Sequence, residues 1–206
     1  MTHALQRIIA AAAGTACLGA TAIAAAQAPS PVALVNQFEA TGGKFEGYRR
    51  SGAKGVCATG EFVGSEAARA LSSASVFSGK PIPVSARFSI GGGNPQAPDN
   101  GKSQRNMALL FELPDGEQWI QGNINAPVFG ASTPQQLLDL LASRQPDPAT
   151  KAADPAKVKA FNDANPEVLL QGRHFASQPV QASFATVNYW GVHAYGFVNA
   201  SGAKQF

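Results

Sequence analysis

Cysteine, histidine and charged residues are all scarce in this chain. Its 206 residues include 2 cysteines and 3 histidines, and only 14% are charged. The histidines and Cys57 have no metal-ligand spacing, which argues against a zinc site. The 16 lysines and arginines are scattered, which argues against a nucleic-acid-binding surface. The 21 glycines and 14 prolines argue against a helical bundle or coiled coil. The chain is long enough to form one globular domain.

Residues 1–26 have the pattern of a secretory signal peptide. Arg7 is their only fixed charge, an Ala-rich apolar stretch follows it, and small residues, Ala24-Ala25-Ala26, close the segment. A short membrane anchor is the alternative, which the small and polar residues within the stretch disfavour. Cleavage would leave residues 27–206 with a single cysteine, Cys57, which cannot form an internal disulfide. We therefore expect a soluble, exported, periplasmic protein with no membrane span after cleavage.

Three helix starts are marked by a capping residue followed by proline. They are Ser30-Pro31, Thr133-Pro134 and Asp154-Pro155. The first helix is expected to end at Gly42-Gly43, and the third before Asn165-Pro166.

Alternating residues from 83 to 90 predict a strand. Its apolar face carries Phe88 and Ile90 among others, and its polar face carries Arg87 and Ser89. More strands are expected over residues 107–113 (apolar on both faces and so buried on both), from about 119, over 182–187 and over 191–198. Strands, then helices, then strands favour an α+β fold with an antiparallel sheet or barrel.

The chain ends in the middle of a predicted hairpin. Residues 198–204 have the pattern of a strand that enters a turn, and only Gln205-Phe206 remain to begin the partner strand. Such an end would leave an open sheet edge. We expect the chain to be a truncated piece of a longer protein.

Arg87 is the first candidate for a binding role. A surface arginine on an exposed face is the simpler interpretation. The other is a strand that lines a cavity, where the guanidinium would meet a carboxylate or phosphate of a ligand. The pattern by itself leaves both open.

Five short segments between Gly47 and the last residue follow, in order, the motifs of one known family. They are residues 49–55 (R-x-x-H-A-x-G in the family), 83–89 (P-V-x-x-R-F-S), 105–111 (R-G-x-A-x-K-F), 123–129 (N-N-T-P-V-F) and 183–197 (Y-G-V-H-x-F). These segments resemble the haem catalases. The short spacings and the exported start most resemble the catalase-related peroxidases, a small periplasmic branch.

The resemblance implies an antiparallel β-barrel of the catalase type with peripheral helices, incomplete at the C-terminus, over residues 27–206. The barrel would hold haem b. Arg49 and Arg87 would contact the haem propionates, and Phe129 would pack over the distal face of the haem.

The same resemblance implies a peroxidase that reduces hydrogen peroxide or organic peroxides with a small organic donor. Ser89 would orient the distal base. Asn123 or Asn125 would hydrogen-bond the peroxide, and one extra residue before Pro127 leaves that choice open.

Two departures from the family pattern limit this prediction. Gly52 stands at the position of the distal histidine, which moves a proton in the family, so activity is expected to be impaired. The iron-binding tyrosine of the R-x-x-x-Y motif has no counterpart, since no arginine is followed by tyrosine four positions later. The alternatives are a non-catalytic periplasmic barrel that binds haem or an apolar ligand, and an inactive fragment. The oligomeric state stays open.

Overall fold

The computed structural model describes residues 28–206. The helices are α1 (Pro31–Gly42), α2 (Glu66–Leu71), α3 (Pro134–Ser143), α4 (Pro155–Ala164) and α5 (Leu169–Ser177). The strands are β1 (Gly55–Val63), β2 (Pro81–Ile90), β3 (Arg105–Glu112), β4 (Gln118–Ile124), β5 (Trp190–Gly191), β6 (Phe197–Val198) and β7 (Lys204–Gln205).

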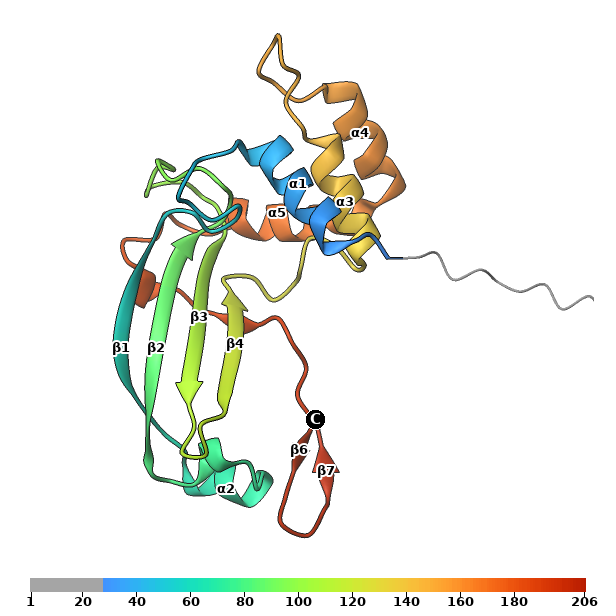
Figure 1. The fold of residues 1–206 in the computed structure, drawn as a ribbon. Coiled ribbons are helices and arrows are strands. Elements are labelled where there is room, and N and C mark those ends of the chain that lie inside the picture. Colours follow the sequence, from blue (N-terminus) through green and yellow to red (C-terminus); the bar gives the residue numbers. More distant parts are fainter. Residues whose placement is uncertain (1–27) are drawn as a thin grey trace, which may run out of the picture.

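The main sheet has the order β1-β2-β3-β4-β5, and every neighbouring pair is antiparallel. Figure 1 shows α1, α3, α4 and α5 together at one end of this sheet and α2 at the other end. The predicted α+β class with an antiparallel sheet is confirmed. In residues 28–206 the sheet does not close on itself, so the barrel stays a prediction.

The strand register divides the sheet into two faces, because directly paired residues share a face. Ser89 pairs with Gly55 and Asn106, and Asn106 pairs with Ile124. We call their side the Ser89 face. Phe88 pairs with Met107, which pairs with Asn123, and we call that side the Phe88 face.

The hydrophobic core lies on the Phe88 face, at the α2 end of the sheet. Ile82 and Phe111 are buried there, together with Val76 from the segment after α2. The Phe111 ring packs edge-on against Phe62, with ring centres 5.4 Å apart. The prediction that residues 107–113 are buried on both faces is wrong for the described chain, because Ala108 on the Ser89 face is exposed.

The three predicted helix starts are confirmed. Ser30 Oγ accepts from Ala33 N (3.1 Å), and Thr133 Oγ1 accepts from Gln136 N (3.1 Å). Asp154 caps α4 in the same way. These contacts satisfy amide groups that a helix leaves unpaired at its first turn.

The C-terminal segment differs from its prediction. Residues 182–187 form no strand, and Phe184–Thr186 is a short 3-10 helix. The expected strand over 191–198 is reduced to its two ends, β5 and β6, with His193 in a bend between them. The terminal hairpin is confirmed, because Phe197 pairs with Gln205 and Val198 with Lys204.

The predicted signal peptide, residues 1–26, lies outside the described residues. Across residues 28–206, every helix is too short or too polar to cross a membrane.

Candidate functional site

Gly52 occupies a buried turn just before β1 and faces Ser89 and Arg87. Its φ is 63°, in the left-handed region. A Cβ built on Gly52 would lie 3.0 Å from Ser89 Oγ and 3.6 Å from Arg87 Nη1. The fold therefore brings together Gly52, Ser89 and Arg87, three residues from two separate motifs in the sequence.

Arg87 is half-buried and donates to the backbone of the same turn. Its Nη2 lies 2.8 Å from the Gly52 carbonyl oxygen and 3.4 Å from that of Ala53. Burial, followed by the positive charge of Arg49, lowers the pKa of Arg87 below that of free arginine, and Cys57 acts in the opposite direction. In residues 28–206, neither Arg49 nor Arg87 forms an ion pair with a carboxylate. Two neighbouring guanidinium groups without acidic partners favour an anionic ligand.

Beside Arg87, the Ser89 face carries small residues and so forms a low surface, one without large protruding side chains. A Cβ on Gly55 would lie 2.9 Å from both Arg87 Nη2 and Ser89 Cβ, so only glycine fits there without displacement. Across the sheet, Arg87 pairs with Ala108, and Ala108 pairs with Gly122. Ile120, farther along this face, is 66% exposed. The result is an apolar surface bordered by positive charge.

The side chains of Asn123 and Asn125 do not join Ser89. Asn123 belongs to the Phe88 face, and its Nδ2 donates to the Met107 carbonyl oxygen (3.0 Å). Asn125 Oδ1 accepts from the Arg105 backbone N–H (2.7 Å). Both asparagines are buried, and both amides connect β3 to β4.

Asn106 is the amide that does contact Ser89, and sequence analysis missed it. Its Nδ2 donates to Ser89 Oγ (3.2 Å), and its Oδ1 accepts from Gln104 Nε2 (2.6 Å). One signal for it is present in the sequence: Asn106 replaces the glycine of the family's R-G-x-A-x-K-F segment.

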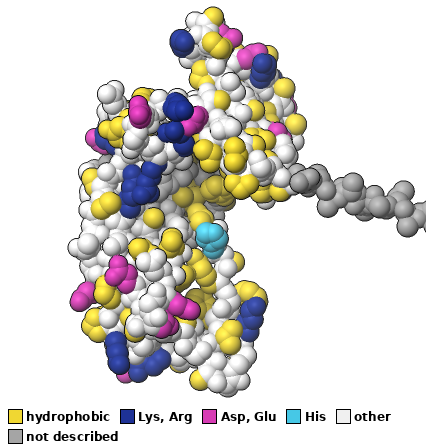
Figure 2. All heavy atoms as spheres, viewed as in Figure 1, with side chains coloured by type: hydrophobic (Ala, Val, Ile, Leu, Met, Phe, Trp, Pro, Cys, Tyr) yellow, Lys and Arg dark blue, Asp and Glu magenta, His cyan; other side chains and the backbone are white. Residues whose placement is uncertain are grey.

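Phe129 lies on a cavity of about 400 Å³ next to this cluster. Its lining comes from helices α1, α3 and α5, from the segment between β4 and α3, and from the segments before β1 and after β2: Phe38, Thr41, Gly42, Arg50, Ser51, Gly91, Gly92, Gly93, Ser103, Gln104, Phe129, Gly130, Leu137, Leu140, Leu141 and Gln171. Figure 2 shows hydrophobic side chains gathered where the helical end meets the sheet. Gln104 therefore connects the cavity to Asn106 and Ser89.

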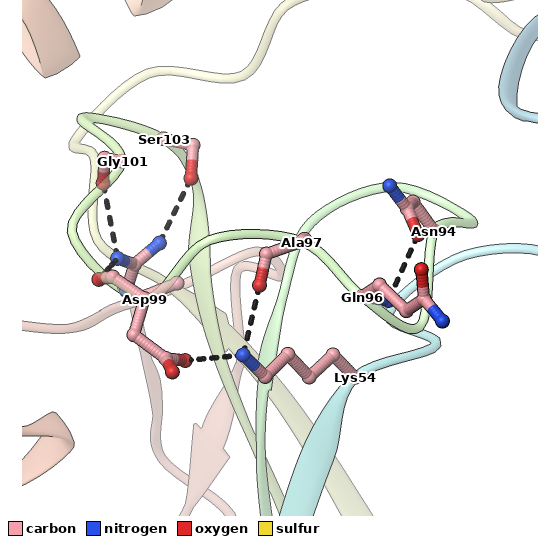
Figure 3. A network of polar contacts seen from close by, with 8 residues as sticks. Lys54, Asn94, Gln96, Ala97, Asp99, Gly101 and Ser103 are labelled. Atoms are coloured by element: carbon pink, nitrogen blue, oxygen red, sulfur yellow. Dashed lines mark hydrogen bonds and ion pairs between the residues drawn. The ribbon is translucent and has the colours of Figure 1, made fainter.

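Two cationic side chains, the half-buried Lys54 and the buried Arg105, hold the loop between β2 and β3 in place. Figure 3 shows Lys54 Nζ between Asp99 Oδ1 (2.8 Å) and the Ala97 carbonyl oxygen (2.8 Å). Arg105 donates to the carbonyl oxygens of Asp99 and Gly101 and to Ser103 Oγ. These contacts hold Gln104, the residue before Arg105, next to the cavity.

Proteins of known family resemble this chain. A catalase-related peroxidase from Synechococcus elongatus is 41% identical over 175 residues, which cover 85% of this chain and 52% of that protein. A catalase-related peroxidase from Mycolicibacterium paratuberculosis is 32% identical over 179 residues, covering 86% and 56%. The chain thus spans about half the length of these curated relatives.

Solved catalase structures have a fold similar to that of this chain. A bacterial catalase structure superposes with a TM-score of 0.68 at 21% identity, covering 97% of this chain and 41% of that one. A fungal catalase gives a TM-score of 0.65 at 23% identity, covering 76% and 32%. The catalase family model matches residues 47–206. By this match over most of its length, together with its relatives, the chain belongs to the catalase family.

Proposed function

We propose that this chain is part of a periplasmic peroxidase that reduces hydrogen peroxide or organic peroxides with a small organic donor. It would bind haem and form the distal side of the haem, where the peroxide binds. The observation that carries the proposal is the Ser89 face, where Arg87 has no carboxylate partner and borders an apolar surface of small residues, with the positive charge of Arg49 acting on it. The names of the relatives agree with this activity.

The residues on this face fit haem b. Haem is a flat apolar ring with two carboxylates, and it needs a surface without large protruding side chains next to cationic groups. Gly55, Ala108 and Gly122 supply the low surface. Arg49 and Arg87 would bind the propionates by charge-assisted hydrogen bonds.

The polar groups near Gly52 would act on the peroxide. When bound, haem iron would supply the electron transfer that cleaves the O–O bond; with two electrons and two protons, hydrogen peroxide gives two water molecules and an organic peroxide gives one alcohol and one water. Ser89 Oγ accepts from Asn106, which leaves its own O–H free to donate toward the space at Gly52. Because Gly52 has no side chain, the protons would come from water instead of a fixed base.

A titration of the purified protein with ferric haem tests the proposal. We expect saturation at one haem per chain with a defined Soret band, followed by peroxide-dependent oxidation of an organic donor such as a phenol. Absence of saturable binding would overturn the haem proposal for this chain.

One observation favours a second function, a barrel that binds haem or an apolar ligand without catalysis. Gly52 removes the side chain that would move a proton, although the neighbouring Ser89 and Arg87 are retained. Under this alternative, haem would bind with a defined Soret band but peroxide-dependent donor oxidation would not exceed that of free haem.

A further inference from the structure

We propose that Asn106 is the amide that binds the peroxide in this protein, in place of Asn123 or Asn125. This inference rests on the proposed function and assigns one residue within it. Asn106 acts together with Ser89, to which it is hydrogen-bonded.

The register excludes one competing asparagine from this side of the sheet. Asn123 pairs with Met107 and so shares the Phe88 face, whereas Ser89 and Asn106 pair directly on the Ser89 face. Neighbouring residues of a strand point to opposite faces. The Asn123 amide is also engaged with the Met107 carbonyl oxygen.

The second competing asparagine is engaged with the backbone. Asn125 Oδ1 accepts from the Arg105 N–H at 2.7 Å, and its Nδ2 lies 3.5 Å from the Ser103 carbonyl oxygen. Asn125 is 8% exposed. Releasing it toward a ligand would leave a buried backbone N–H unpaired, which is costly.

Asn106 retains a free donor. One Nδ2 hydrogen is used on Ser89 and the Oδ1 is held by Gln104. Among the described residues, nothing accepts the second Nδ2 hydrogen. Asn106 is half-buried, so that hydrogen can reach a ligand on the Ser89 face. Gln104 fixes the orientation of the amide, so that nitrogen and not oxygen faces Ser89.

The family motifs explain how the amide could change strands. With Pro127 as the fixed point, the first asparagine of N-N-T-P falls on Ile124, and the glycine of R-G-x-A falls on Asn106. Ile124 and Asn106 are direct partners on the Ser89 face. Where the family motifs have asparagine on β4 and glycine on β3, this chain has Ile124 on β4 and Asn106 on β3. The amide therefore lies on β3 instead of β4.

Cyanide affinity of the haem-loaded protein provides a test that does not depend on turnover. A donor next to a haem ligand stabilises bound cyanide, so Asn106→Ala is expected to weaken cyanide binding about tenfold. Asn106→Asp keeps the shape and the contact from Gln104 but loses the N–H donors, and the same loss is expected. Gln121→Ala, a matched amide on the Phe88 face, should change the affinity by no more than about twofold.

Relocating the amide gives the decisive comparison. Adding Ile124→Asn to Asn106→Ala is expected to restore most of the lost cyanide affinity, because directly paired residues have Cβ atoms about 5 Å apart. Unchanged cyanide affinity in both Asn106 variants, or a larger loss in Asn123→Ala, would overturn the assignment. If the unsubstituted protein binds no haem, the proposed function itself fails; if it binds haem and cyanide, only the role of Asn106 is at stake.

Discussion

Gly52 lies next to the polar side chains of Ser89 and Arg87 but has no side chain of its own that could move a proton. Its φ of 63° lies in the left-handed region, where histidine is several-fold enriched among the few non-glycine residues found. A Cβ there would lie 3.0 Å from Ser89 Oγ, so a small shift of the serine is needed. The backbone can therefore carry a histidine at a moderate cost, on the order of 1 kcal/mol.

We predict that Gly52→His raises peroxide-dependent donor oxidation by the haem-loaded protein about tenfold or more, because positioned acid–base groups contribute at least that much. Steady-state oxidation of a phenolic donor measures the effect. Gly52→Ala is the matched control, since it has the same backbone cost without the imidazole. Equal rates in the two variants would contradict the prediction.

Arg87 and Arg49 are expected to determine haem affinity. We predict that Arg87→Ala weakens haem binding about tenfold, since a hydrogen bond to a charged group contributes about 1.5 kcal/mol or more. Titration followed by the Soret band gives the dissociation constant. Arg173→Ala, an exposed arginine of α5, is the control and should leave it unchanged. A similar loss in both variants would indicate a nonspecific charge effect.

The residues of the site were only partly predictable. Gly52, Ser89 and Arg87 were identified from linear motifs, and the structure brings them within contact of one another. Asn106 was missed because its relation to Ser89 depends on the register between β2 and β3, which no single motif specifies. The same register separates Asn123 from this cluster.

Helix α3 borders the cavity near Gly52, and its start depends on a side-chain cap. Thr133 Oγ1 accepts from Gln136 N, and Gln136 Oε1 accepts from the Ser132 N–H (2.6 Å). The glutamine therefore contacts the residue before the cap rather than the cap itself, a variation on the usual capping box.

Thr133→Ala is expected to lower the free energy of unfolding by about 1 kcal/mol, because an amide of the first turn loses its acceptor. Urea denaturation followed by circular dichroism measures the change. Ser132→Ala is the matched control: its hydroxyl makes no hydrogen bond to the described residues. If both substitutions cost the same, the cap is not what stabilises α3.

Helices that begin with a capping residue followed by proline were predicted, and the other two were not. Helices α1, α3 and α4 each have a capping residue before proline. Helix α5 begins directly after a 3-10 turn with no side-chain cap. Helix α2 is capped by Ser65, but no proline follows the cap and the helix has only six residues. The two-residue strands β5 and β6 are too short to produce a periodic pattern, so pairing with distant partners decides them.

For the molecule as a whole, export is a separate prediction. We expect the protein to be cleaved after Ala26, so that the mature chain begins at Gln27, and to be recovered from the periplasm of an expressing bacterium. N-terminal sequencing of that fraction identifies the cleavage site. Arg7→Glu, which reverses the only fixed charge of the segment, should reduce the periplasmic yield. An uncleaved chain retained in the membrane fraction would instead support the anchor.

The strand order has a consequence for how the protein acquires its structure during synthesis. Strands β1 to β4 lie side by side in the order in which they are made, so each can find its partner as soon as the next one emerges. The connections between these strands, residues 64–80, 91–104 and 113–117, are much shorter than the one that precedes β5, so they close at a lower entropic cost and pair faster. Strand β5 is different, because the chain from Ile124 to Trp190, including three helices, must be complete before it can dock on β4. We therefore expect strands β1 to β4 to pair early and in sequence, and β5 to add to the edge of β4 in a separate, later step.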